Sequence, residues 1–141
     1  MTAPLRVLGL ALAPLAGCIV YDDTNPPRGP VNSAPFVESA AAGCYWDPGY
    51  RDHIWYFEAA VSDPDGALDV VAVYADVYDA RGELVDTFDV LPTQDPIWWF
   101  SDWLGSSTWL DCGYPHYTVD IVAYDSFDAW DVLTIIPYIE P

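Results

Sequence analysis

The sequence predicts an all-β fold, a single antiparallel β-sandwich of about seven strands. Several short segments alternate apolar and polar side chains with a period of two. Clusters of Asp, Pro, Gly and Ser separate these segments at close spacing, as in sandwich domains. No segment carries the sustained 3.6-residue period of the crossover helices that connect parallel strands.

The first 17 residues have the pattern of an export signal. The apolar run from Leu5 to Leu15 is shorter than the ~20 residues of a membrane-spanning helix, which favours a cleaved signal. The run ends in Leu15-Ala16-Gly17-Cys18, which resembles the lipobox of bacterial lipoproteins. The resemblance implies cleavage before Cys18, lipidation of Cys18 on its sulfur and its new amino group, and a membrane anchor for everything that follows.

The residue after the lipobox bears on localisation. In the enterobacterial sorting rule that this resemblance brings with it, Asp at that position retains a lipoprotein in the inner membrane. Ile19 stands there instead, so we expect a lipid-anchored protein of the bacterial cell envelope, at the outer membrane. Residues 18–34 are expected to form a tether, because they are rich in Pro and Asp and show no periodicity.

The predicted domain occupies residues 35–139, and its strands follow one another with short turns. Segment 55–61 ends at an Asp-Pro-Asp-Gly turn, and Asp79 to Gly82 forms a hairpin turn. Segment 97–104 is aromatic, and segment 130–137 is the last strand. Side chains expected to share the apolar faces are Trp55, Phe57, Ala59 and Val61; Val71, Val73, Ala75 and Val77; Leu84, Phe88 and Val90; and Tyr117, Val119, Ile121 and Ala123.

The charge of the chain narrows its partners. The formal net charge is -18, from 22 acidic residues against four Arg. Such a chain repels nucleic acid and anionic lipid, and it attracts cations or basic partners. We therefore expect no nucleic-acid partner, although an acidic surface also serves solubility alone.

The cysteines predict one disulfide. The chain has three Cys, and lipidation accounts for Cys18. The remaining two, Cys44 and Cys112, form an even set in an exported chain, which predicts that they pair. No Cys or His spacing indicates a zinc site, and neither His53 nor His116 lies in a metal motif.

Two segments resemble a known domain family. The pattern Trp-x-Phe-x-Ala-x-Val-x-Asp-Pro-Asp-Gly at 55–66 and the pattern Tyr-x-Val-x-Ile-x-Ala-x-Asp at 117–125 resemble strands B and F of bacterial immunoglobulin-like domains of the cadherin and PKD type. The resemblance implies a two-sheet Greek-key sandwich, with adhesive or spacer roles more often than catalysis. The chain lacks the clustered Glu and Asp-x-Asn-Asp motifs of cadherin calcium sites, so calcium does not carry over with it.

Acidic residues are expected to converge at one end of such a sandwich. In that topology the turns after the two matched strands lie at the same pole, which brings Asp63 near Asp125, with Asp65 and Asp128 close by. Converging carboxylates repel one another or recruit a cation, and calcium takes six to eight oxygen ligands from such loops. The alternative is that each Asp caps its own turn through side-chain to backbone hydrogen bonds.

The aromatic segment is the other candidate site. Four of the seven Trp are Trp98, Trp99, Trp103 and Trp109. Neighbouring residues of a strand point to opposite faces, so one of Trp98 and Trp99 enters the core while the other faces outward. Exposed Trp beside Asp stacks on sugar rings or anchors a protein partner, which predicts a ligand site at these four residues. A bulky core covered by an aromatic lid is the alternative.

No motif of enzymatic chemistry stands out. The sequence has no Gly-x-Ser-x-Gly, no phosphate-binding Gly-rich loop after a strand and no His-Glu-x-x-His. We therefore expect no catalytic residues and a binding or structural role, with an envelope protein or a glycan as the partner. A carbohydrate-binding module and a calcium-stabilised adhesion domain are the two alternatives.

Overall fold

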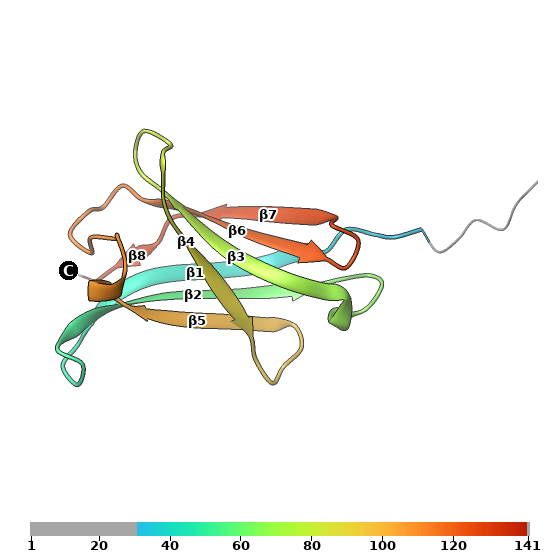
Figure 1. Ribbon diagram of the computed structural model, residues 1–141, viewed down its shortest axis with the longest axis horizontal. Helices are drawn as coiled ribbons and strands as arrows, with labels where there is room; N and C mark the ends of the chain where they lie inside the picture. Colours follow the sequence, from blue (N-terminus) through green and yellow to red (C-terminus); the bar gives the residue numbers. More distant parts are fainter. Residues whose placement is uncertain (1–30, 141) are drawn as a thin grey trace, which may run out of the picture. The chain divides into compact units, whose positions relative to one another are not determined.

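The computed structural model describes residues 31–140, and these residues form an all-β domain (Figure 1). The predicted signal segment, Cys18 and most of the predicted tether lie outside the described residues. Residues 31–140 contain no helix long and apolar enough to cross a membrane. The elements are β1 (Phe36–Asp47), β2 (Asp52–Ser62), η1 (Ala67–Asp69), β3 (Val70–Tyr78), β4 (Leu84–Pro92), β5 (Trp98–Leu104), η2 (Gly105–Ser107), β6 (Thr118–Asp125), β7 (Trp130–Ile135) and β8 (Tyr138–Ile139).

The strands form one curled sheet in the order β7-β6-β3-β4-β5-β2-β1-β8. All neighbours are antiparallel except β1 and β8, which pair in parallel at Gly43 with Tyr138 and Cys44 with Ile139. The two halves of the sheet meet where the end of β4 pairs with β5. Leu91 pairs with Phe100 there, and Pro92 pairs with Trp99. The curl brings β1 close to β7, where the Val37 amide donates to Asp131 Oδ2 at 2.9 Å.

This topology confirms the all-β prediction and corrects its architecture. The sequence predicts a two-sheet antiparallel sandwich of about seven strands, whereas residues 31–140 form eight strands in one mixed sheet. The difference arises at two places. First, β4 pairs with β3 along most of its length and with β5 at its end, which joins the two halves into one sheet. Second, the two-residue strand β8, which is too short to show a period, pairs in parallel with β1.

The core lies inside the curl and follows the alternation of β2 and β6. Trp55 and Phe57 of β2 are fully buried, as are Val119 and Ile121 of β6. Aromatic rings fill the centre: Trp55 meets Tyr117 edge-on at 5.8 Å between ring centroids, and Phe57 stacks on Phe88 at 4.8 Å. The predicted apolar faces of these two strands are therefore confirmed.

Two expected core residues instead face the solvent. Val71 and Leu84 are more than half exposed, and their neighbours Val70 and Val85 turn inward. Val71 lies at a register shift between β3 and β6, and Leu84 lies next to a register shift between β3 and β4. A bulge adds one residue to a strand and inverts which side chains face the core, so these two assignments were wrong by one position.

The predicted disulfide is present. Cys44 of β1 and Cys112, in the loop before β6, are bonded with Cα atoms 5.9 Å apart. Beside it, Gly43 allows the close approach of β8, because a Cβ there would lie 2.5 Å from the Tyr138 carbonyl oxygen and 2.8 Å from the ring of Tyr56. The Glu140 amide then donates to the Cys44 carbonyl at 3.0 Å, so the end of the described chain is held against the disulfide.

Candidate functional site

Three carboxylates meet at one end of the domain, which we call the acidic pole. Asp63 follows β2, Asp69 ends η1 and Asp125 ends β6, and each offers an oxygen within 4.8 Å of the others. In Figure 1 the β2–β3 connection and the β6–β7 turn lie at the right-hand end of the domain. The acidic pole comprises these three residues and Asn32, whose side-chain Nδ2 donates to Asp125 Oδ2 at 2.6 Å.

The turn after β2 is shaped by its own side chains. The Asp65 amide donates to Asp63 Oδ1 at 2.7 Å, and the Gly66 amide donates to the Asp63 carbonyl at 3.0 Å. Gly66 has φ 127°, a conformation that a residue with a side chain rarely adopts. The Asp69 amide then donates to the Gly66 carbonyl at 2.8 Å, which brings Asp69 back toward Asp63.

The β6–β7 turn is built around Asp125, which is 1% exposed. Its Oδ1 accepts the amides of Phe127 and Ala129, both at 2.8 Å. Burial raises the pKa of Asp125, but the hydrogen bonds from Asn32 and from these two amides outweigh it, so the pKa lies below its ordinary value. Asp125 is therefore ionised at neutral pH.

Three oxygens of the acidic pole have no hydrogen-bond partner. Asp63 is 8% exposed and Asp69 is half-buried, and in each the Oδ2 atom is shielded from solvent and accepts no bond. The Oδ1 atom of Asn32 is likewise shielded from solvent and accepts no hydrogen bond. Asp69 Oδ1, in contrast, accepts the Ser126 hydroxyl, and the Ser126 amide donates to the Asp69 carbonyl at 3.0 Å. The pole thus presents three free oxygen ligands, the type that hard cations bind.

The structure brings together only two of the four acidic residues that the sequence singles out as metal ligands. Asp63 and Asp125 converge as expected, but Asp65 Oδ2 accepts the Ser33 amide at 2.7 Å and Asp128 is exposed with φ 63°. Sequence reasoning missed Asp69 and Asn32. Asp69 directly precedes β3, whose start pairs with Asp125, so a correct β3–β6 pairing would have predicted its position. Asn32 lies before the predicted start of the domain, and no sequence motif around it indicates a metal ligand.

The four candidate Trp residues do not share one surface. Trp99 is 6% exposed and belongs to the core, whereas Trp98 is 41% exposed on the opposite side of β5. Trp103 lies on the inward side, 5.6 Å from the Phe88 ring, and donates from Nε1 to Ser101 Oγ at 3.4 Å. Trp109 follows η2 and is 82% exposed. The expected four-residue ligand site therefore does not form. Trp99 belongs to the core, and Trp98, Trp103 and Trp109 lie on different surfaces.

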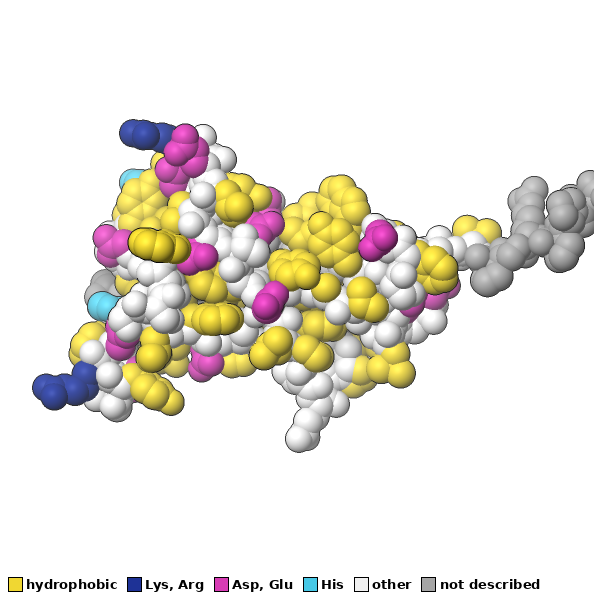
Figure 2. All heavy atoms as spheres, in the orientation of Figure 1, with side chains coloured by type: hydrophobic (Ala, Val, Ile, Leu, Met, Phe, Trp, Pro, Cys, Tyr) yellow, Lys and Arg dark blue, Asp and Glu magenta, His cyan; other side chains and the backbone are white. Residues whose placement is uncertain are grey.

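Apolar side chains nevertheless gather on the outward side of β5 and on the neighbouring end of β4. We call this the outer aromatic face; it consists of Leu91, Trp98, Phe100 and Leu104, all partly exposed. Near its Leu104 end lies a hollow of about 230 Å³ lined by Tyr50, Ile54, Asp102, Trp103 and Leu104. Figure 2 shows that hydrophobic and acidic side chains are interspersed on the visible side of the domain. An aromatic platform beside carboxylates suits stacking on a sugar or a protein side chain.

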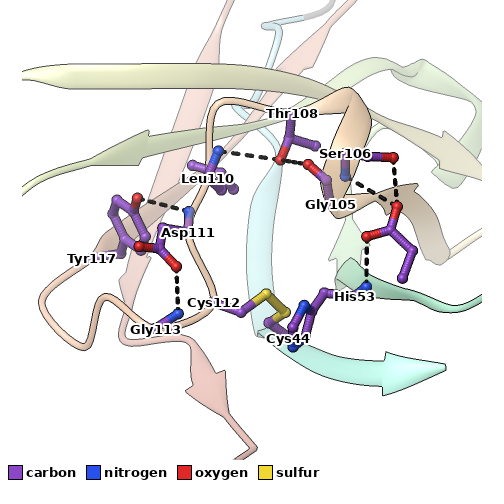
Figure 3. Close-up of a disulfide and its surroundings, with 11 residues drawn as sticks. Cys44, His53, Gly105, Ser106, Thr108, Leu110, Asp111, Cys112, Gly113 and Tyr117 are labelled. Atoms are coloured by element: carbon purple, nitrogen blue, oxygen red, sulfur yellow. Dashed lines mark hydrogen bonds between the residues drawn. A yellow bond between two sulfur atoms is a disulfide. The ribbon is translucent and has the colours of Figure 1, made fainter.

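The opposite end, which we call the disulfide pole, satisfies its acids internally. Asp52 starts β2, and its Oδ2 accepts the Ser106 hydroxyl at 2.5 Å and the Ser106 amide at 3.2 Å. Its Oδ1 accepts the His53 amide at 2.8 Å, and Figure 3 draws these bonds beside Cys44 and Cys112. The Ser106 hydroxyl does most to hold the pKa of Asp52 below its ordinary value. No carboxylate oxygen of this pole is buried without a partner among residues 31–140.

Comparisons with known proteins give a limited likeness. No family model matches the chain, and no curated protein matches it in sequence. Among solved structures, the crystal structure of the β-glucuronidase of Parabacteroides merdae aligns with 74% of this chain and 13% of that chain, at 16% identity and a TM-score of 0.43. The domain is thus a β-rich domain that resembles part of that bacterial enzyme, and the likeness concerns structure alone.

Proposed function

We propose that the chain is a lipid-anchored protein of the bacterial cell envelope with a non-catalytic binding or structural role at the outer membrane. The observation that carries this proposal is Leu15-Ala16-Gly17-Cys18 at the end of a short apolar run. The disulfide between Cys44 and Cys112 supports export, because disulfides persist in oxidising compartments. The alternating segments 55–61 and 117–123 support an immunoglobulin-like origin of the domain, in the form of one curled sheet.

The anchor is tested by removing the acylated sulfur. Cys18→Ser in the full chain, expressed in a bacterium with two membranes, should lose partitioning into the detergent phase and keep its uncleaved signal. Ile19→Asp is the matched control, because it retains Cys18 and its lipid but changes the sorting residue. The control should still partition into detergent and should move to the inner-membrane fraction. Unchanged partitioning of Cys18→Ser would refute the anchor.

Carbohydrate binding is the second candidate function, favoured by the outer aromatic face and the hollow beside Trp103. Stacking of a ligand ring on an exposed Trp contributes on the order of 1–3 kcal/mol. Removal of the Trp side chain should therefore weaken binding about tenfold or more. The test is a glycan array with the wild type, followed by affinity measurements for Trp98→Ala and Trp103→Ala.

The controls separate loss of a contact from loss of the fold. Trp130→Ala removes a comparably exposed Trp from β7 and should leave glycan affinity unchanged. Trp99→Ala is expected to destabilise the domain by about 3–5 kcal/mol, because it empties a core position. Absence of any glycan hit, or equal losses for Trp98→Ala and Trp130→Ala, would exclude a sugar site on the outer aromatic face.

A further inference from the structure

We propose that the acidic pole binds one calcium ion through Asp63, Asp69 and Asp125, with the side-chain amide oxygen of Asn32 as a fourth ligand. This set differs from the one that the sequence pattern suggests, since Asp65 and Asp128 are replaced by Asp69, from the same β2–β3 connection, and by Asn32, from the segment before β1. The inference is independent of the lipid anchor, because all four ligands belong to the folded domain.

The unpartnered oxygens point to a ligand. Buried polar atoms in native proteins are nearly always hydrogen-bonded, and an ionised oxygen without a partner is costly. Asp63 is more than nine-tenths buried, and its free Oδ2 belongs to the side chain that converges with Asp69 and Asp125. Asp69 and Asn32 each add one shielded oxygen without a partner. Turn capping explains Asp63 Oδ1 and Asp125 Oδ1, but it leaves these other oxygens unexplained.

The charge at the pole favours a bound cation. Three carboxylates approach within 4.8 Å, and like charges at that separation repel one another. The basic residues of the described chain are Arg51, in the β1–β2 turn, and Arg81, in the β3–β4 turn. Figure 2 shows the Arg side chains of residues 31–140 at the left-hand end, away from the β6–β7 turn at the right. A bound divalent cation relieves the repulsion and gives each free oxygen a partner.

The donor set selects calcium among common cations. All four groups supply oxygen, which suits calcium or magnesium and disfavours metals that prefer nitrogen or sulfur. Calcium bonds oxygen at roughly 2.3–2.6 Å, so two of its ligands lie up to about 5 Å apart, which accommodates oxygens within 4.8 Å of one another. Magnesium bonds at roughly 2.0–2.1 Å in a strict octahedron, so it would require the cluster to contract. Water completes the coordination of calcium at the open side.

Calcium binding would join three segments that are distant in sequence. Asn32 lies before β1, Asp63 and Asp69 lie in the β2–β3 connection that contains η1, and Asp125 ends β6. The ion therefore stabilises the pole at which the chain enters the domain. With dissociation constants of roughly 10⁻⁴–10⁻³ M, as in extracellular modules, several millimolar calcium should raise the melting temperature by about 5 °C.

The test uses the full-length protein purified in detergent and stripped with EDTA. Calorimetric titration with calcium chloride should give saturable binding of one ion per chain, and magnesium chloride should bind at least tenfold more weakly. Thermal melts in calcium, in EDTA and in sodium chloride of matched ionic strength should show a rise that is specific to calcium. Asp69→Asn should weaken calcium binding at least tenfold.

Asp128→Asn is the matched control, because it removes the same charge from the same pole at an exposed position with φ 63°, which Asn adopts readily. It should bind calcium as the wild type does. Asp69→Asn is expected to fold, because it removes repulsion, and its melting temperature in EDTA verifies this. The proposal is overturned by the absence of saturable calcium heat in the wild type, or by equal losses in the two variants, which would indicate diffuse screening of the acidic surface.

Discussion

The two poles of the domain treat the same residue type in opposite ways. At the disulfide pole, Asp52 has both carboxylate oxygens hydrogen-bonded, by Ser106 and His53, and the chain there is crosslinked covalently. At the acidic pole, Asp63 and Asp69 each keep one shielded oxygen without a partner. An Asp-rich turn is therefore not one kind of structure. The carboxylates of the disulfide pole are hydrogen-bonded within residues 31–140, whereas those of the acidic pole keep oxygens free for a ligand.

The largest contrast between the poles should come from removing the crosslink. The disulfide closes a sequence separation of 68 residues, for which chain-entropy arguments give about 4 kcal/mol. The double variant Cys44→Ala/Cys112→Ala should therefore lose about that much free energy of unfolding in urea titrations. The same loss should appear with calcium and with EDTA, since the crosslink is remote from the acidic pole. A loss below 1 kcal/mol would show that the disulfide pole is held by other contacts.

Gly43→Ala is expected to have the next largest effect. Its Cβ would collide with the Tyr138 carbonyl and the Tyr56 ring, so β8 must move away from β1 at a cost of about 1–3 kcal/mol. Urea unfolding measures the loss. Gly49→Ala is the control at the same pole, because its Cβ would lie 3.0 Å from the movable Asp47 carboxylate. Equal effects of the two substitutions would contradict the close packing of β8.

A matched pair of Asp substitutions tests whether carboxylates destabilise one pole and stabilise the other. In EDTA, Asp69→Asn should leave the melting temperature unchanged or raise it, because the relief of repulsion from Asp63 and Asp125 offsets the weaker acceptance of the Ser126 hydroxyl by the amide. Asp52→Asn should lower the melting temperature, because the amide accepts the Ser106 and His53 bonds less well than the carboxylate. Thermal melts of both variants under one condition decide the signs. Two shifts of the same sign would remove the distinction between the poles.

The smallest effect is a shift in acid titration. The Ser106 hydroxyl is the main cause of the lowered pKa of Asp52, so Ser106→Ala should raise that pKa toward its ordinary value. A lowered pKa contributes stability that is complete above the ordinary Asp value of about 4 and is lost as the pH falls through the lowered value. The variant should therefore lose stability at higher pH than the wild type does. Carboxyl NMR titration measures the shift, and Asp79, whose pKa is lowered mainly by backbone amides, should not move.

The sequence predicted the features that depend on parity within one strand. The alternation of β2 and β6 places Trp55 and Val119 in the core, which follows from period two alone. The convergence of Asp63 and Asp125 was predicted from the topology that the immunoglobulin-like resemblance implies. The sequence could not predict that Val71 faces the solvent, because a bulge inverts parity without changing the local pattern. It also could not predict Asp69 in the cluster, since that depends on which strands pair.

The disulfide and the parallel β1–β8 pair together define how the domain would carry a tensile load. A pull on residues 31 and 140 draws β1 and β8 past each other along their length, so their backbone bonds are loaded in shear and break together. The crosslink between Cys44 and Cys112 removes 68 residues, roughly 230 Å of fully extended chain, from what force can draw out. Strands β2 to β5 are thus sheltered from the load, and the extensible length of the domain lies before Cys44 and after Cys112.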